Sequence, residues 1–384
     1  MFYLDNAATS WPKPESVYKT LDESFRQMFS PKRGTSKASR LGGDKLSQAR
    51  QSVAGLFNMP DPNRVCFTAG CTYSLNIALQ AFPWQADDAV VMSAMEHHAL
   101  SRPIRKLARE KGIRFHIVPY TNNLPYNLST LESLLKSDAN IRMVATTHAS
   151  NVIGSVMPVL EIGQLAKKYN KVFLVDAAQS AGVLPVDVQA MNIDLLALPG
   201  HKSLYGPPGV GVLYVGENAQ LNTFMEGGTG NDSGKHEMKP TPPDGVEVGT
   251  IPLPLILALA EGVRWVEETG LDKIHAHETQ LLSQLIEGLQ QLPEITIYGH
   301  TDVTGKTPVV SFNVGSLNPK DVGNRLFDEF GIALRAGFHC APMAHEAIGT
   351  ISRGGTVRAS IGYFTRPEDV AALLSALKQL LVAA

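Results

Sequence analysis

The sequence is poor in cysteine and has no long apolar run. Its 384 residues include three cysteines, Cys66, Cys71 and Cys340. This odd, unclustered set argues against a disulfide framework and against a zinc site. The apolar run at 251–260 is too short for a bilayer-spanning helix, which needs about 18 such residues. The first residues lack a basic segment followed by an apolar core, so we expect no signal peptide.

An excess of charge of either sign is also missing. Lys and Arg total 34 and Asp and Glu total 36, for a net charge of −2. There is no basic surplus for nucleic acid and no acidic tail. We therefore expect a soluble, cytoplasmic protein that binds neither nucleic acid nor membranes and holds no metal. Its length and its 44% hydrophobic content allow two domains with sizeable cores.

Seven short apolar runs predict the strands of one sheet. They lie at residues 65–68, 89–93, 114–118, 142–146, 172–175, 194–198 and 210–215. Helical periodicity fills several of the gaps, as at 44–58 and 161–169, so we predict an α/β fold with helices on both faces. The segment 199–209 is too short for the crossover that parallel neighbours need. We therefore expect the run at 210–215 to be antiparallel in an otherwise mostly parallel sheet.

The last third of the chain predicts a smaller α/β unit. A polar, Gly- and Pro-rich loop at 227–243 precedes it. Helices are expected at 253–268, 272–292, 320–330 and from Pro367, and strands at 308–314, 332–335 and 357–361. We predict a large domain of residues 15–257 and a small domain formed by residues 1–14 and 258–384.

Polar side chains follow five of the predicted strands. The segment 68–72 follows the first, His97 the second, Asn151 the fourth, Asp176 the fifth and Lys202 the sixth. In open α/β sheets, ligands bind at the carboxyl ends of the strands. We therefore expect these residues to meet at one edge of the sheet.

Lys202 and Asp176 are suited to bind the aldehyde and the ring nitrogen, respectively, of a pyridine-aldehyde cofactor. A lysine amine forms a Schiff base with the aldehyde, and a carboxylate holds the protonated ring nitrogen. Lys202 must be partly neutral to react, which desolvation and nearby cations favour. Taken alone, either residue is more typical of an ordinary surface position, so the prediction depends on the whole set.

Gly70, Cys71 and Thr72 precede a helical run at 73–79. Free N–H groups and a hydroxyl at a helix start form an anion cradle, where the phosphate of the cofactor would bind. Taken alone, Thr72 is more typical of a simple helix cap.

His97, Asn151 and Gln179 complete the predicted cofactor site. The planar imidazole of His97 could stack on the cofactor ring, and the amides of Asn151 and Gln179 could donate to its phenolic oxygen. Each is also common as a loop or turn residue.

Cys340 and Arg358 are the candidate nucleophile and substrate anchor. Cys340 lies in a loop with Arg335 and His339, and nearby cations favour the nucleophilic thiolate. Arg358 would bind a substrate α-carboxylate, since the arginine guanidinium commonly binds carboxylates through two parallel hydrogen bonds. The alternatives are a buried, inert cysteine and a strand-end ion pair.

Six motifs, taken together, resemble the class V aminotransferase family, and most of all its cysteine desulfurase branch with a short catalytic-cysteine loop. They occur in family order and span nearly the whole chain. They are Tyr-Leu-Asp-Asn-Ala-Ala-Thr at 3–9, Glu-His-His-Ala at 96–99, Ser-Asn-Val-Ile-Gly at 150–154, Val-Asp-Ala-Ala-Gln at 175–179, Gly-His-Lys at 200–202 and Arg-Ala-Gly-Phe-His-Cys-Ala at 335–341.

The resemblance implies a fold-type-I pyridoxal 5′-phosphate enzyme, with a mixed, mostly parallel seven-stranded sheet and a homodimeric assembly. It implies that His201 binds the cofactor phosphate, that Thr250 reaches the phosphate of the neighbouring subunit, and that Arg335 lies near the substrate. The reaction would convert L-cysteine to L-alanine. The sulfur would be held on Cys340 as a persulfide and passed to an acceptor protein or thiol.

Three alternatives remain open. Selenocysteine lyase chemistry would use the same residues on L-selenocysteine. Another class V aminotransferase or lyase reaction would leave Cys340 without a role. A protein that binds the cofactor without catalysis is a third possibility. Pro199 stands where the family often has a phosphate-binding serine, and Ser203 is an extra residue after Lys202, so both bear on the phosphate contacts.

Overall fold

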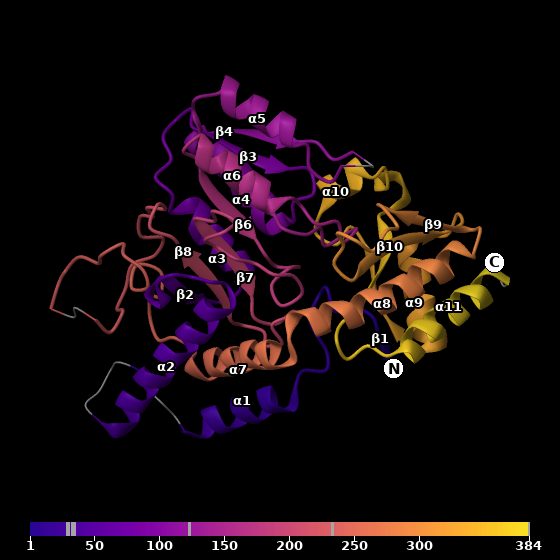
Figure 1. Cartoon of the computed structure of the whole chain (residues 1–384), viewed down its shortest axis with the longest axis horizontal. Coiled ribbons are helices and arrows are strands. Elements are labelled where there is room, and N and C mark those ends of the chain that lie inside the picture. Colours follow the sequence, from indigo (N-terminus) through magenta and orange to yellow (C-terminus); the bar gives the residue numbers. More distant parts are fainter. Residues whose placement is uncertain (28–30, 32–35, 122–123, 232–233, 383–384) are drawn as a thin grey trace.

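The larger part of the chain is built on one seven-stranded sheet (Figure 1). A computed structural model describes residues 1–27, 31, 36–121, 124–231 and 234–382. The strands follow one another in the order β2-β8-β7-β6-β5-β3-β4. They are β2 (Val65–Thr68), β3 (Ala89–Ser93), β4 (Arg114–Val118), β5 (Ile141–Thr147), β6 (Val172–Asp176), β7 (Leu195–Pro199) and β8 (Gly211–Val215). All seven predicted strands are present, with ends shifted by no more than about one residue.

β8 is the antiparallel member of this sheet, as predicted. It pairs antiparallel with both β2 and β7, whereas β7, β6, β5, β3 and β4 pair parallel with one another. The turn between β7 and β8 is too short to carry the chain back across the sheet. It therefore stays at the carboxyl end of β7, where it projects Lys202.

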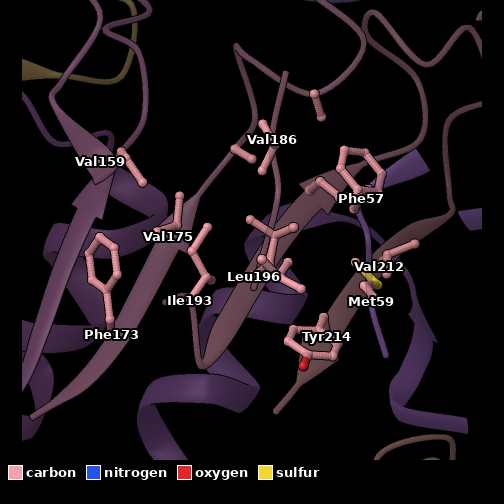
Figure 2. Close-up of a cluster of buried hydrophobic side chains, with 14 of the residues drawn as sticks. Phe57, Met59, Val159, Phe173, Val175, Val186, Ile193, Leu196, Val212 and Tyr214 are labelled. Carbon is pink, nitrogen blue, oxygen red and sulfur yellow. The ribbon is translucent and has the colours of Figure 1, made fainter. Parts of the chain in front are cut away.

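Helices cover both faces of the sheet and make two apolar layers. Alternate strand residues face opposite sides. Phe173, Val175, Leu196, Val212 and Tyr214 point into one layer (Figure 2), and their sequence neighbours point into the other. The helices are α2 (Lys37–Leu56), α3 (Cys71–Gln80), α4 (His98–Lys111), α5 (Leu128–Ser137) and α6 (Val159–Lys168), with α1 (Glu15–Gln27) and α7 (Leu253–Thr269) packed together beside them.

A four-stranded antiparallel sheet forms the core of the smaller unit, drawn in orange and yellow in Figure 1. Its strand order is β12-β13-β10-β9. The elements are α8 (Leu271–Gln290), β9 (Ile295–Tyr298), β10 (Val309–Val314), α9 (Pro319–Phe330), β11 (Ile332–Ala333), β12 (Arg335–Gly337), α10 (Pro342–Ala347), β13 (Thr356–Ser360) and α11 (Pro367–Val382). Short 3₁₀ turns lie at Pro62–Arg64 and Ile351–Arg353. The remaining strand, β1 (Phe2–Tyr3), pairs parallel with β11.

The predicted strand at 332–335 is wrong in one respect, because it is divided at Leu334. β11 pairs with β1, while β12 pairs with β13 in a different sheet. The N-terminal strand β1 forms its backbone hydrogen bonds with residues 332–333, so these residues do not join the sheet that contains β12. The local sequence gives no sign of this long-range pairing. The division into domains at residue 258 stays a prediction; α7 crosses that point and packs on α1 and α2.

The segment between β8 and α7 is irregular in its described residues, as predicted for 227–243. Glu247 fixes its last part to the large sheet. Its carboxylate accepts hydrogen bonds from Arg50 Nη1 at 2.7 Å and from the backbone N–H of Phe67 at 2.7 Å. Both charged side chains are buried. Within the described residues, no helix combines the length and apolar composition needed to cross a bilayer.

Replacing Glu247 by alanine should destabilise the protein strongly, because it leaves the Arg50 guanidinium buried without a counter-charge. Breaking such a pair costs about 3–5 kcal/mol. We expect a clear drop in the urea and thermal unfolding midpoints of Glu247→Ala. Glu329→Ala is the matched control, since Glu329 pairs with Arg325 at 2.7 Å on the surface and should leave the midpoints nearly unchanged. Equal shifts in the two variants would contradict the assignment.

Candidate active site

A cavity of about 530 Å³ lies at the carboxyl ends of β5, β6 and β7. The structure brings together there most of the residues predicted for the site, which come from both units of the chain. They are Gly70, Cys71, Thr72, His97, Asn151, Asp176, Gln179, His201, Lys202, Arg335 and Arg358. Cys340 lines an adjoining groove rather than the cavity itself. Thr250 is exposed and is not among the cavity-lining residues, so its contact with a neighbouring subunit stays a prediction.

Asp176 and Lys202 form a coupled acid–base pair in the cavity wall. Asp176, only 1% exposed, accepts hydrogen bonds from the Ala178 N–H at 2.9 Å and the Cys71 thiol at 3.4 Å. Burial raises the pKa of Asp176 and lowers the pKa of Lys202, and the opposite charge of the partner limits each change. Lys202 is thereby favoured as a neutral amine, the form that can attack a carbonyl carbon.

The backbone that presents Lys202 is held from two sides. Ser10 Oγ donates to the carbonyl oxygens of His201 at 3.2 Å and Lys202 at 2.9 Å. On the other side, Gly182 has φ of +83°, and a Cβ at that position would lie 2.2 Å from the Ser203 oxygen. Only glycine fits such a close approach. The amine is therefore carried on a rigid turn.

The start of α3 presents free backbone donors to the cavity. Gly70 has φ of 146° and precedes the helix. The first helical hydrogen bonds run from the N–H groups of Tyr73 and Ser74 to the Gly70 oxygen, each at 3.0 Å. The N–H groups of Cys71 and Thr72 come before these bonds, and both residues line the cavity. This arrangement suits an anion such as a phosphate.

His97 caps α4 and is neutral. Its Nδ1 accepts a hydrogen bond from the Ala99 N–H at 3.0 Å. Burial, followed by the charge of Lys202, lowers the pKa of His97 to about 3. An uncharged imidazole in the cavity wall can lie against an aromatic ring without electrostatic cost. The same effects lower the pKa of His201 to about 4.

Glu96 is a buried residue that connects two strand ends next to the site, and no role was assigned to it from the sequence. It is fully buried and accepts hydrogen bonds from the N–H groups of Thr147 at 2.9 Å and Ser93 at 3.2 Å. Burial raises the pKa of Glu96 to about 7. Its carboxyl group ties the end of β3 to the end of β5, directly before His97. The signal was present, since Glu96 opens one of the six family motifs.

Arg358 and Asn151 connect the two units across the cavity. Arg358 is 1% exposed. Its guanidinium donates to Asp5 Oδ1 at 2.7 Å and to the backbone carbonyl oxygen of Asn151 at 3.0 Å. Its Nε has no hydrogen-bond partner among the described residues. The Asn151 amide donates to the His339 oxygen at 2.7 Å, and Gln179 Nε2 donates to the Ala7 oxygen at 3.0 Å. Neither Asp5 nor Ala7 was predicted individually, although both belong to the motif at 3–9.

The Cys340 loop is strained and firmly held. His339 and Cys340 have φ of 48° and 57°, left-handed values that cost non-glycine residues energy. The Cys340 oxygen accepts from the His98 N–H at 2.7 Å, and His339 Nε2 lies 3.0 Å from Thr356 Oγ1. Arg335 Nη2 donates to Cys340 Sγ at 3.7 Å. The thiol is exposed, so the alternative of a buried, inert cysteine is wrong.

The profile of the class V aminotransferase family matches residues 2–373. A relative described as a probable cysteine desulfurase of Pyrococcus abyssi is 34% identical over 99% of this chain and 94% of its own length. A cysteine desulfurase of Serratia proteamaculans is 32% identical over 98% and 93%. The apo structure of the cysteine desulfurase from Thermococcus onnurineus superposes with a TM-score of 0.93 at 31% identity, covering 100% of this chain and 95% of that one. The chain belongs to the class V aminotransferase family.

Members of this family use pyridoxal phosphate, and the cavity of this class V aminotransferase fits that group. The fit rests on the donors present. Free N–H groups at the start of α3 suit a phosphate, the buried Asp176 carboxylate suits a ring nitrogen, and the Lys202 amine suits an aldehyde. Among the described residues, no cluster of three His, Cys, Asp or Glu side chains could hold a metal ion.

We expect the His97 imidazole to remain neutral from pH 5 to pH 8 in the cofactor-free protein, because its pKa is about 3. ¹⁵N-histidine NMR checks this, with His97→Gln assigning the signal. An unfolded histidine has a pKa of about 6.5, so the unfolded chain binds more protons between pH 6.5 and 3. Stability must then fall as the pH drops through that window. The thermal midpoint of His97→Gln should fall less steeply than that of the parent, and a His97 titration above pH 5 would contradict this.

Proposed function

We propose that this protein is a pyridoxal-phosphate-dependent cysteine desulfurase. It would convert L-cysteine to L-alanine and hold the sulfur as a persulfide on Cys340. The observation that carries the proposal is an exposed thiol, under the guanidinium of Arg335, beside a cavity that contains Lys202, Asp176 and Arg358. The relatives described as cysteine desulfurases support it.

Substrate binding falls to Arg358. Asp5 and the Asn151 oxygen occupy only part of its guanidinium, and its Nε has no partner. A substrate α-carboxylate can take these remaining N–H groups in a two-point contact. Because Asp5 already balances part of the charge, the carboxylate would be bound without leaving Arg358 buried and unpaired in the free protein.

Proton transfer falls to Lys202. When bound, pyridoxal phosphate supplies an aldehyde carbon that links to an amine and a ring that accepts electrons from the substrate Cα. Asp176 would stabilise positive charge on the ring nitrogen, since its buried carboxylate lines the cavity. The neutral amine of Lys202 then takes the proton from the substrate Cα and returns it to the product. The rigid turn around Ser10 and Gly182 keeps this amine in position.

Sulfur transfer falls to Cys340. Its thiolate attacks the substrate sulfur, so that a new S–S bond forms as the substrate C–S bond breaks. The overall change balances: L-cysteine and the Cys340 thiol give L-alanine and the Cys340 persulfide. No external oxidant or reductant is consumed. The N–H of Arg335 would stabilise negative charge on the Cys340 sulfur in both states.

We further propose a cytoplasmic homodimer that passes the sulfur to an acceptor protein or thiol. Thr250 does not line the cavity of its own chain, which suits the predicted contact with the neighbouring subunit. Cys66, Cys71 and Cys340 are free thiols, as expected in a reducing compartment.

Cys340→Ala should lower the rate of L-alanine formation from L-cysteine by about 100-fold or more, because the sulfur loses its acceptor. Mass spectrometry after brief exposure to L-cysteine should find one added sulfur atom on the Cys340 peptide of the parent protein. Cys66→Ala is the matched control, since Cys66 is buried in the sheet, and should retain both activity and the sulfur adduct.

Undiminished sulfur release by Cys340→Ala would overturn the proposal in favour of a lyase or transaminase that does not use this thiol. Comparing turnover of L-cysteine with that of L-selenocysteine decides the remaining alternative. A preference for L-selenocysteine that survives in Cys340→Ala would indicate a selenocysteine lyase.

Lys202→Ala should abolish covalent attachment of pyridoxal phosphate. Borohydride reduction of the loaded parent protein should add the mass of one reduced cofactor to the Lys202 peptide and remove the visible absorption band. Lys202→Ala should gain no such mass, whereas Lys378→Ala, at an exposed position on α11, should behave like the parent. A reduced adduct on another lysine would contradict the role of Lys202.

A further inference from the structure

A groove with a basic wall lies beside the active-site cavity. The basic side chains of this wall take no part in the chemistry described above. Its wall is one face of α4, which carries Arg102, Arg105, Lys106 and Arg109. Their spacing of three, four and seven residues puts all four side chains on one stripe of the helix. The open groove has a volume of about 680 Å³, and Cys340 is among its lining residues.

The groove and the cavity lie side by side, and Cys340 lines the groove. Thr72, Asn76, His97 and Ala99 line both. α4 begins beside the thiol, because the His98 N–H donates to the Cys340 oxygen at 2.7 Å. The stripe then runs from Arg102 to Arg109, about 10 Å along the helix at 1.5 Å per residue. A ligand in the groove would therefore reach Cys340 from outside while the substrate lies within.

The cations of the groove are poorly neutralised. None of its lining residues is acidic. Arg102 and Arg109 are exposed and make no ion pair with any described carboxylate. Lys106 Nζ lies 3.9 Å from Glu110 and donates to Gln80 at 3.1 Å. Positive charge concentrated in a hollow attracts anions and speeds their association.

Arg105 has a packing role in addition to its charge. Its guanidinium lies over the Phe115 ring, 5.2 Å from the centroid, and donates to the Met343 sulfur at 3.6 Å. It therefore links α4 to α10, the helix that follows the Cys340 loop. Arg102 and Arg109 make no such contact with the residues that the structure describes, so we expect their replacement to leave the fold intact.

We propose that this groove docks an acidic, thiol-bearing segment of the protein that accepts sulfur from Cys340. The inference rests on the proposed desulfurase function. L-cysteine carries no net charge and is bound inside the cavity, so it does not explain four cations outside it. A stripe of four cations can pair with several carboxylates along an extended peptide segment. A small thiol compound carries only one or two carboxylates and would leave most of these cations unpaired. Docking would bring the acceptor thiol beside Cys340, which lines the groove.

The transfer step needs no further reagent. The acceptor thiolate attacks the outer sulfur of the Cys340 persulfide. A new S–S bond forms on the acceptor as the S–S bond to Cys340 breaks, and the electron pair leaves on Cys340 as its thiolate. The cations of the groove and Arg335 would stabilise the negative charge that moves between the two sulfurs.

The test uses the full-length holoenzyme and synthetic peptides that carry one cysteine each. One peptide is rich in Asp and Glu, and a second of equal length has Asn and Gln in their place. The enzyme is loaded with radiolabelled sulfur from L-cysteine, and transfer to each peptide is timed. Arg102→Ala/Arg109→Ala is compared with Lys273→Ala/Lys378→Ala, which removes the same charge from exposed positions on α8 and α11.

We expect the acidic peptide to accept sulfur about tenfold faster than the neutral peptide at low salt, with the advantage shrinking as ionic strength rises. The Arg102→Ala/Arg109→Ala variant should lose most of that advantage, and the Lys273→Ala/Lys378→Ala variant should keep it. Fluorescence anisotropy of a labelled acidic peptide with serine in place of cysteine should show the same order of affinities.

Three results would overturn the proposal. The two peptides could react at equal rates. Glutathione at the same concentration could match the acidic peptide, which would make the groove a site for a small anionic thiol. The Arg102→Ala/Arg109→Ala variant could change the oligomeric mass in sedimentation, which would assign the groove to a second copy of this chain. Anisotropy needs no sulfur on Cys340, so a missing persulfide would contradict the proposed function without deciding the groove.

Discussion

The active site depends on burying one guanidinium between segments that are far apart in the chain. A charge as deeply buried as that of Arg358 must be paired, because an unpaired one would cost several kcal/mol. Asp5 supplies the counter-charge from the N-terminal segment, and the Asn151 oxygen supplies an acceptor from the loop after β5. Meeting this requirement brings β13 of the smaller unit against the edge of the large sheet. The cavity lies where these three segments meet, so in the proposed function one interaction would serve both substrate binding and the packing of the two units.

Much of the fold was predictable because local physics determines it. The seven apolar runs became the seven strands of the large sheet, since helices bury both faces of the sheet and most of its strands are therefore short, nearly continuous apolar runs. The short turn at 200–210 was enough to predict that β8 is antiparallel. The location of the site at one edge of the sheet was also predictable. The carboxyl ends of parallel strands lie at the same edge, so the residues that follow these strands lie close together. Lys202, Asp176 and His97 were found by this rule.

What sequence could not give was the pairing of distant partners. Asp5 and Arg358 are 353 positions apart, and nothing in the spacing of either residue points to the other. The same holds for β1, which takes residues 332–333 out of an otherwise continuous strand. Glu96 was overlooked for a different reason. A buried carboxylate is rare, so pattern reasoning assigns a glutamate to the surface; only the donors of Ser93 and Thr147 around it explain its position.

The geometry of the Cys340 loop limits how the thiol can work. Two successive residues in left-handed conformations would relax unless the surroundings held them. Asn151, Thr356 and the start of α4 hold them with hydrogen bonds of 2.7, 3.0 and 2.7 Å. A short loop held at three points has little freedom to move, so in the proposed function Cys340 would receive and release sulfur from nearly one place. Cys340 lines the basic groove beside the cavity, where the proposed substrate and the proposed acceptor would reach the same sulfur in turn. The hydrogen bonds that hold the strained loop therefore also fix the position of the thiol.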